Sequence, residues 1–171
     1  MRVVAGTLGG RRLVSPEGRT TRPTTDRVRE AIFNSLGSWG LIEGALVADL
    51  YAGSGAVGIE AISRGAEHCI FVERDRDALR ALEDNVDQLE LGPRTRVLRS
   101  DALGAAGNLD VDLVFADPPY DFNDWELLAE RVGAPLFITE SGHSLPELDG
   151  WTVAREKRYG RTWVTFLERL D

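Results

Sequence analysis

The chain has 171 residues, of which 43% are hydrophobic and 28% charged, a composition typical of a globular domain with a sizeable core. A single cysteine excludes an internal disulfide framework, and two histidines leave no cluster with metal-ligand spacing. These counts lead us to expect a cytoplasmic protein without a metal. No apolar run is long enough to cross a membrane, so membrane insertion is not expected. The lone thiol, Cys69, is expected to be a small buried core residue.

Charge is divided unevenly along the sequence. The net charge is −8, yet the first 30 residues carry seven arginines against three acidic side chains, whereas the remainder carries 13 basic against 25 acidic side chains. The planar guanidinium group of arginine suits phosphate groups. A basic segment therefore precedes an acidic body, and this clustering favours contact with a nucleic-acid backbone.

Residues 1–21 form the predicted basic arm. Short β-branched runs at residues 2–5 and 11–15 flank a glycine-rich turn, a pattern that predicts a β-hairpin. Contacts with phosphates would hold an RNA strand without reading its sequence. The arginines expected to make these contacts are Arg2, Arg11, Arg12 and Arg19.

An amphipathic helix is expected next, because apolar residues from Val28 to Trp39 recur at helical spacing. Thr24 or Thr25 is its expected N-cap, and Gly37 or Gly40 lies near its end.

From about residue 44 the pattern alternates between apolar strands and amphipathic helices, which predicts a parallel sheet covered on both faces. The clearest helix spans residues 75–91. After residue 150 the alternation stops, and residues 151–158 and 162–170 predict an antiparallel hairpin at the sheet edge. The expected fold is therefore α/β, with residues 22–171 as one domain. The strands that precede the hairpin are expected at residues 46–51, 69–73, 96–99, 111–116 and 136–139.

A glycine-rich loop follows the first strand of this sheet. Its spacing, Gly53-x-Gly55-x-x-Gly58, is that of a dinucleotide-binding turn, and Glu73 lies where an acidic side chain could accept ribose hydroxyls. Taken alone, this spacing fits either NAD or S-adenosylmethionine. Asp49 would repel a pyrophosphate but suits a cationic amino-acid group, and this favours S-adenosylmethionine. A turn without any ligand is the remaining alternative.

Asp101 follows the strand expected at residues 96–99. A ligand stretched along the carboxyl edge of the sheet would place its adenine there. The Asp101 carboxylate could accept a hydrogen bond from the adenine amine. Alternatively, Ser100 or Asp101 caps the helix that starts at Ala102. The two roles are compatible.

The segment Asp117-Pro118-Pro119-Tyr120 ends the strand at residues 111–116 and carries the most specific signal. Two prolines fix the backbone and remove two N–H donors, so the carbonyl groups and Asp117 form a corner of hydrogen-bond acceptors. Such a corner suits the exocyclic amine of a base. Tyr120 offers a ring on which an extruded base could stack. A plain strand terminator is the alternative.

The chain resembles the bacterial 16S ribosomal RNA guanine-N2 methyltransferases of the RsmD type. The resemblance runs along MRVVAG, RPTTDRVREAIFN, DLYAGSGAVGIEAISRGA and FADPPY. It implies a Rossmann-like seven-stranded sheet with an RNA-contacting hairpin, and methylation of guanine 966 in that RNA. By the resemblance, Asp117, Pro118, Pro119 and Tyr120 form the catalytic segment that holds the base. Implied cofactor contacts are Asp49, Tyr51, Gly53, Ser54, Gly55, Glu73, Arg74, Asp101, Ala102, Arg22, Pro23 and Thr24.

Within this family pattern Tyr51 stands where phenylalanine is more frequent. By the resemblance, Glu73 would hold the ribose and Asp101 the adenine, while the segment from Arg22 to Thr24 would close over the cofactor. The amino-acid end would be held by Asp49, Gly53, Ser54 and Gly55. The expected partner is ribosomal RNA or the small ribosomal subunit, and the expected state is a monomer.

Several alternatives remain open on the sequence. A DNA amino-methyltransferase would use the same acceptor corner, and a protein-amide methyltransferase would leave the basic arm without a purpose. A NAD-dependent oxidoreductase fits the glycine spacing but leaves Asp49 unexplained, and a non-catalytic RNA-binding module would make the cofactor residues vestigial. A cytosine-C5 mechanism is disfavoured, because Cys69 lies within a strand. Glu140 and His143 are expected to be solvated or capping residues.

Overall fold

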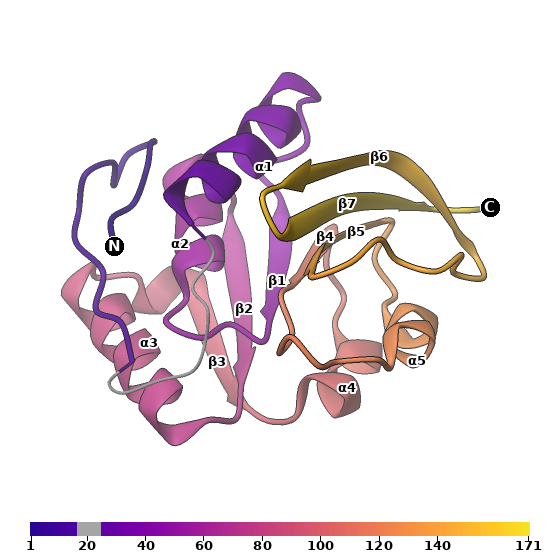
Figure 1. The fold of residues 1–171 in the computed structure, drawn as a ribbon. Helices are drawn as coiled ribbons and strands as arrows, with labels where there is room; N and C mark the ends of the chain where they lie inside the picture. The colour runs from indigo at the N-terminus through magenta and orange to yellow at the C-terminus, as the bar shows by residue number, and fades with distance from the viewer. Residues whose placement is uncertain (17–24) are drawn as a thin grey trace.

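The computed structural model describes residues 1–16 and 25–171. In these ranges a seven-stranded sheet has the order β3-β2-β1-β4-β5-β7-β6 (Figure 1). The first five strands run parallel and β7 is antiparallel to both of its neighbours. The strands are β1 (Leu46–Leu50), β2 (His68–Glu73), β3 (Thr95–Arg99), β4 (Leu113–Ala116), β5 (Leu136–Ser141), β6 (Trp151–Tyr159) and β7 (Thr162–Arg169).

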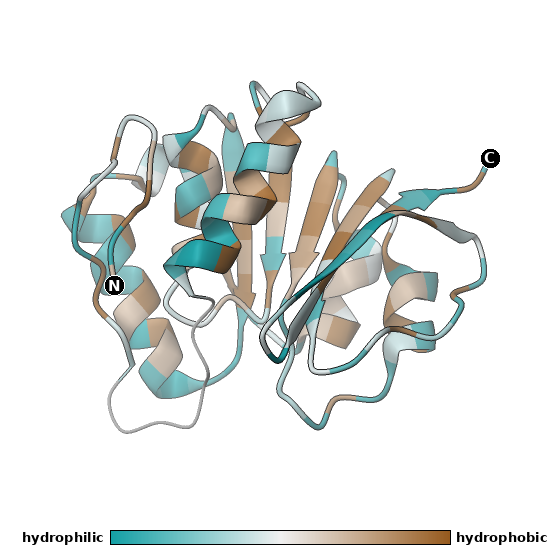
Figure 2. Ribbon diagram, turned by 45° about the horizontal axis from the view of Figure 1, so that its top comes forward, coloured by the Kyte–Doolittle hydropathy of each residue, from teal (hydrophilic) through white to brown (hydrophobic). Residues whose placement is uncertain are grey.

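Helices cover both faces of the sheet (Figures 1 and 2). One buried cluster joins α1 (Asp26–Ser38), α2 (Ala56–Ser63) and α3 (Arg76–Gln88) to one face, and a second joins α4 (Ala102–Ala105) and α5 (Trp125–Arg131) to the other. Because side chains alternate along a strand, Val47 belongs to the first cluster, whereas Ala48 and Leu50 belong to the second. Among the described residues no helix is long and apolar enough to cross a membrane. Short 3₁₀ turns lie at η1 (Gly92–Arg94) and η2 (Ala106–Asn108).

The predicted α/β sheet with an antiparallel C-terminal hairpin is confirmed, and element bounds differ by a few residues at most. Thr25 is the N-cap of α1, where its hydroxyl oxygen accepts a hydrogen bond from the Val28 N–H at 3.2 Å. The helix predicted over residues 75–91 ends earlier, at Gln88. Leu89 is its C-cap, and Glu90 adopts a left-handed conformation with φ of 57°, which stops the helix.

The C-terminal hairpin extends the sheet beyond β5. Ser141 of β5 pairs with Trp163 of β7, and Trp163 pairs in turn with Arg158 of β6. The hairpin turn at Tyr159–Thr162 therefore lies at the carboxyl edge of the parallel strands. A register shift interrupts β6 between Val153 and Arg155, as is common on edge strands.

The N-terminal arm pairs with itself over a shorter stretch than predicted. A single antiparallel bridge joins Arg2 to Arg12, and the Val3 N–H donates to the Arg11 carbonyl at 2.9 Å. The ladder stops there because the N–H groups of the next two residues donate to the carboxylate of Glu60 on α2 instead. Val3 is only 1% exposed, so the described part of the arm packs on the body of the protein.

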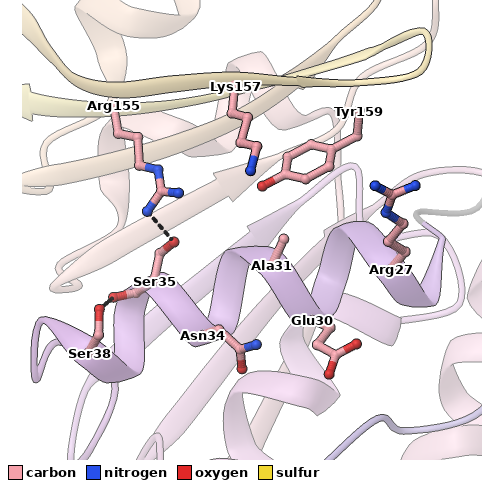
Figure 3. A pocket seen from close by; sticks show the side chains of 9 residues that line it. All are labelled: Arg27, Glu30, Ala31, Asn34, Ser35, Ser38, Arg155, Lys157 and Tyr159. Atoms are coloured by element: carbon pink, nitrogen blue, oxygen red, sulfur yellow. Dashed lines mark hydrogen bonds between the residues drawn. The ribbon is translucent and has the colours of Figure 1, made fainter.

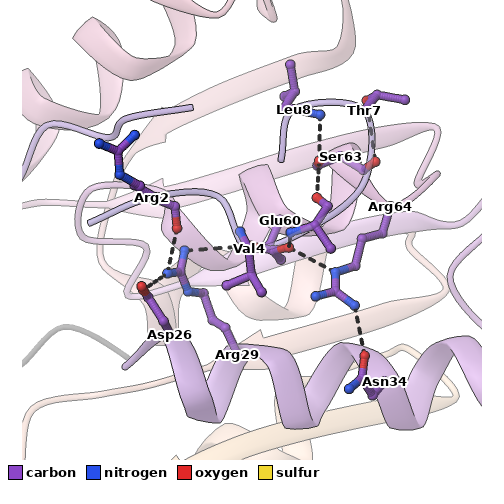
Figure 4. A network of polar contacts seen from close by, with 11 residues as sticks. Arg2, Val4, Thr7, Leu8, Asp26, Arg29, Asn34, Glu60, Ser63 and Arg64 are labelled. Atoms are coloured by element: carbon purple, nitrogen blue, oxygen red, sulfur yellow. Dashed lines mark hydrogen bonds and ion pairs between the residues drawn. The ribbon is translucent and has the colours of Figure 1, made fainter. Parts of the chain in front are cut away.

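A polar network fixes the arm to α1 and α2 (Figure 4). Glu60 is fully buried and lies 3.7 Å from the equally buried Arg29, while Arg64 donates to it at 2.9 Å. Arg29 also donates to the carbonyl of Arg2 at 2.9 Å. Gly6 has φ of 85°, and a Cβ there would lie 2.0 Å from a backbone oxygen of α2. The close approach at Gly6 and the hydrogen bonds with Arg29 and Glu60 hold the arm in one place.

Candidate active site

Asp49 anchors the start of the glycine loop. It lies on the central strand β1 between β2 and β4, is 4% exposed, and accepts a hydrogen bond from the Gly58 N–H at 2.9 Å. A Cβ at Gly58 would lie 2.5 Å from the Cys69 sulfur and 2.4 Å from the Phe71 ring. Glycine at this position therefore lets α2 pack closely on β2 and present its first turn to Asp49.

Burial raises the pKa of Asp49 well above its usual value. The Gly58 N–H opposes this effect by stabilising the carboxylate, whereas the charges of Asp117 and Glu73 add to the increase. The charges of Asp117 and Glu73 thus lie close enough to Asp49 to act on it. A cation bound beside Asp49 would favour its charged form, so this position suits a cationic ligand.

The loop from Tyr51 to Gly55 contains three residues with a left-handed backbone conformation. Tyr51, Gly53 and Gly55 have φ values of 56°, 59° and 86°. Gly55 is the N-cap of α2, and a Cβ there would lie 2.4 Å from the Leu82 side chain. At Gly53 a Cβ would meet nothing within 4 Å, so this part of the loop borders open space. The backbone can therefore approach a ligand closely, as expected for a cofactor loop.

Glu73 holds the glycine loop from the end of β2. One carboxylate oxygen accepts from the Gly53 N–H at 2.8 Å, and the other accepts from the N–H groups of Arg74 at 2.9 Å and Asp75 at 3.0 Å. An ionised carboxylate has about four acceptor positions, so three backbone bonds leave capacity for a hydroxyl group. The predicted ribose position is compatible with this geometry.

Asp101 caps α4, where its carboxylate accepts from the Gly104 N–H at 3.1 Å. This confirms the capping interpretation, while an adenine contact stays a prediction. The exposed guanidinium of Arg74 lies 3.7 Å from the same carboxylate. Arg74 and Asp101, both predicted cofactor contacts, are therefore neighbours in the structure. Ala102 follows as the first, buried residue of α4. Burial, with the nearby Asp101 charge, raises the pKa of Tyr51 to about 12.

The segment after β4 forms the other side of the site. Asp117 is partly buried and Pro118 buried, whereas Tyr120 is 63% exposed. Together with Pro119 they line a narrow pocket that is completed by residues 140–143 at the end of β5. The Tyr120 ring lies over Gly142, where an added Cβ would be 2.7 Å from the ring.

The expectation for Glu140 was wrong. This residue is 5% exposed, because β5 has β4 on one side and β7 on the other and is buried along its whole length. Ala116 pairs with Thr139, so Asp117 and Glu140 occupy the next position on adjacent strands. His143 is exposed as expected, and its ring nitrogen lies 2.9 Å from a neighbouring carbonyl oxygen.

Aromatic contacts join the two sides of the site. Tyr51 meets Phe122 edge to face with ring centroids 5.6 Å apart, and Phe122 meets Trp125 in the same way at 5.0 Å. The glycine loop and the Asp117–Tyr120 segment are therefore packed together through one ring. Among the described residues no group of acidic, histidine or cysteine side chains could hold a metal ion.

Asn85 on α3 has a supporting role that the sequence did not reveal. It is fully buried, and its amide nitrogen donates to the carbonyls of Ser54 and Val14, both at 2.9 Å. Its oxygen accepts from the Val14 N–H at 2.7 Å. One side chain thus connects the glycine loop with the arm. The sequence signal for it is an asparagine that falls on the apolar face of the predicted amphipathic helix.

The predicted RNA contacts fall into two groups. Arg2, Arg11 and Arg12 are exposed on the arm, where the Arg2 guanidinium donates to the Gly10 carbonyl at 2.8 Å. Arg19 lies outside the described residues, as do three predicted cofactor contacts, Arg22, Pro23 and Thr24.

The strand order, the reversed β7 and the glycine loop at the carboxyl edge place the chain in the class of methyltransferases. The family model described as Conserved hypothetical protein 95 matches residues 1–168, and the chain belongs to this family, of the RsmD type.

Similar proteins cover nearly the whole chain. A protein of Bacillus subtilis described as "Putative rRNA methyltransferase YlbH" is 39% identical, with 99% of each chain covered. The "Ribosomal RNA small subunit methyltransferase D" of Escherichia coli is 34% identical, with 99% of this chain and 90% of that protein covered.

Among solved structures, "Putative methyltransferase yhhF from Escherichia coli" has a TM-score of 0.85 and 35% identity, with 99% of this chain and 97% of that chain covered. An RNA methyltransferase from Salinibacter ruber in complex with S-adenosyl-L-homocysteine shares the fold at a TM-score of 0.68 and 16% identity, over 88% of this chain and 95% of that one.

Proposed function

We propose that the protein transfers a methyl group from S-adenosylmethionine to the exocyclic N2 of a guanine in small-subunit ribosomal RNA. The names of its relatives support the RNA substrate. The family resemblance points to guanine 966 as the target. The protein would act in the cytoplasm on ribosomal RNA or on the small subunit, as a monomer.

The observation that carries the choice of base is the pair of carboxylates in one pocket. Asp117 and Glu140 both line the narrow pocket beneath Tyr120. The carboxylate form of an acidic side chain offers only hydrogen-bond acceptors. Guanine presents two adjacent donors on its pairing edge, N1–H and the N2 amine, whereas adenine presents a donor beside an acceptor. Two acceptors therefore match guanine better than adenine.

The glycine loop and its acidic neighbours fit the cofactor. Asp49 would face the cationic amino-acid end, Glu73 the ribose hydroxyls and Asp101 the adenine amine. Tyr51, Gly53, Ser54, Gly55, Arg74 and Ala102 would complete the contact. S-adenosylmethionine supplies a methyl group that its positive sulfur activates for attack by a nucleophilic nitrogen.

The residues after β4 would orient the base for direct in-line transfer. Asp117 accepts hydrogen bonds from the amine, and the prolines keep the neighbouring carbonyls fixed. The N2 lone pair then points toward the methyl group, and positioning supplies most of the rate. Tyr120 stacks on the extruded base. The proton leaves the methylated amine for Asp117 or for water.

The basic arm supplies affinity for the RNA backbone. Arg2, Arg11, Arg12 and Arg19 would contact phosphates, so RNA binding should weaken steeply with salt. If deletion of residues 1–20 left the RNA affinity and its salt dependence unchanged, the arm would have only a structural role.

Methyl transfer tests the proposal directly. Labelled S-adenosylmethionine is offered with three substrates, namely small subunits that lack the modification, naked 16S ribosomal RNA and duplex DNA, and the products are digested to nucleosides. N2-methylguanosine from the ribosomal material is the expected product. N6-methyladenosine, or transfer to DNA alone, would overturn the choice of substrate while keeping the cofactor.

The variant Glu140→Gln tests the choice of base independently. It replaces an acceptor by an amide that also donates, so discrimination between guanine and adenine substrates should fall. Unchanged discrimination, with a folded protein, would contradict the acceptor-pair argument.

A further inference from the structure

An open groove separates α1 from the edge strand β6 (Figure 3). It has a volume of about 420 Å³, within the range of roughly 300–1,000 Å³ typical of ligand-sized sites. Arg155, Lys157 and Tyr159 of β6 point toward α1, which supplies Arg27, Glu30 and Asn34 on the opposite wall.

The groove is positively charged, whereas the protein as a whole is negatively charged. Three of its side chains, Arg27, Arg155 and Lys157, are cationic and exposed, against the single carboxylate of Glu30. The whole chain has a net charge of −8. A local cationic strip on an acidic protein focuses attraction on one surface, and it would hold an anionic chain there.

The strand pairing places one end of the groove near the candidate active site. Trp163 pairs with Ser141 on one side and with Arg158 on the other, and Ser141 lines the pocket that holds Asp117. Tyr159 lies one position further along β6, at the carboxyl edge of the parallel strands. One end of the groove, at Tyr159 and Arg27, therefore opens at the edge where the base would be held.

The two ends of the groove differ. At the far end Arg155 donates to the Ser35 hydroxyl at 3.1 Å and so bridges β6 to α1. At the near end the Lys157 ammonium lies 5.3 Å from the centre of the Tyr159 ring. A ring beside a cation provides a stacking surface for a base next to a partner for its phosphate, which is how single-stranded nucleic acid is held.

We propose that this groove binds the single-stranded RNA that flanks the target nucleotide, as a second contact separate from the basic arm. Arg27 and Lys157 bind phosphates, and Tyr159 stacks on a base. Arg155 holds the two walls together. This inference rests on the proposed function, since it assigns a path to the RNA substrate of the same site.

The double variant Arg27→Gln/Lys157→Gln tests the phosphate contacts. Binding of naked 16S ribosomal RNA and of an oligouridine strand is measured over a salt series, with Arg80→Gln/Arg96→Gln as the matched control. These two control arginines are exposed on α3 and on the opposite edge strand β3. Loss of two phosphate contacts should reduce the slope of log affinity against log salt by about 1.4. The KM for RNA should rise, with kcat and S-adenosylmethionine affinity unchanged.

Tyr159→Leu and Tyr159→Phe test the stacking contact. Leucine should weaken oligouridine binding by about tenfold, whereas phenylalanine should retain it. Equal loss in both variants would show that the ring does not stack. Melting temperatures of all variants identify any that fail to fold.

The outcomes separate this inference from the proposed function. If wild-type protein methylates ribosomal guanine and the groove variants match the control pair, the groove inference is wrong and the function stands. If the groove variants lose RNA affinity but neither the wild-type protein nor any variant methylates guanine N2, the proposed function is wrong. Weaker binding to assembled subunits, with naked RNA unaffected, would indicate a ribosomal protein as the groove's partner and overturn the proposal.

Discussion

Around the glycine loop the acidic side chains are already engaged by backbone N–H groups, whereas around Tyr120 a large aromatic surface is exposed. Asp49 and Glu73 accept four such hydrogen bonds between them, at 2.8–3.0 Å. Tyr120 is 63% exposed. The proposed function accounts for this difference. A small cofactor would need a preorganised site, while a base that leaves an RNA strand would need an exposed ring on which to stack.

The largest expected effect is on methyl transfer, through a change in the part of the site proposed to hold the base. Asp117→Asn should lower methyl transfer by about 10²–10⁴-fold, because the amine loses its charged acceptor. Affinity for S-adenosylmethionine, measured by calorimetry, should change little. Loss of both together would show that the two sides of the site are not separate.

Asp49→Asn should weaken the part of the site proposed to hold the cofactor. Loss of a charged partner should weaken S-adenosylmethionine binding by about 10–100-fold. The same substitution should stabilise the cofactor-free protein, because it removes a buried carboxylate. Each kcal/mol gained should raise Tm by about 2–4 °C. A lower Tm, or unchanged cofactor affinity, would contradict this assignment.

The raised pKa of Asp49 gives the pH dependence a definite sign. In the folded protein Asp49 holds its proton to higher pH than in the unfolded chain, so its contribution to stability falls as pH rises from the unfolded value through the folded pKa. Cofactor binding has the opposite dependence, since a cation prefers the ionised carboxylate. Affinity should therefore fall as pH is lowered in the wild type, and less so in Asp49→Asn.

Asn85→Ala should disturb the link between the cofactor loop and the arm. It leaves the backbone groups of Val14 and Ser54 without their partner, at a cost of about 1–3 kcal/mol. Tm should fall by several degrees, and cofactor affinity should fall with it. Asn108→Ala, at the end of a 3₁₀ turn on the other face of the sheet, is the control. An effect on stability without any on cofactor binding would limit Asn85 to a structural role.

The smallest effect should come from Gly142→Ala. The new methyl group would displace the Tyr120 ring, which is a flexible side chain, so kcat should fall only a few-fold and Tm should barely change. Gly133→Ala is the control, because a Cβ at Gly133 meets nothing within 4 Å. Equal activity of the two variants would show that the position of Tyr120 is not critical.

The sequence by itself determined the α/β class, the glycine loop and the Asp117–Tyr120 segment, because each depends on residues close together in the chain. Alternating strands and helices, glycines after a strand and prolines after another are local patterns. The C-terminal hairpin is local as well and was predicted correctly, and the structure selects Thr25 from the two N-cap candidates, Thr24 and Thr25.

Only the tertiary structure decided what joins distant segments. Asn85 bonds to a residue 71 positions away, Glu60 to the arm across 55 and 56 positions, and Arg155 to α1 across 120 positions. The burial of Glu140 likewise depends on β7, which comes later in the chain but lies beside β5. A sequence specifies the periodicity of each element, but the neighbours of a side chain are set by how the elements pack.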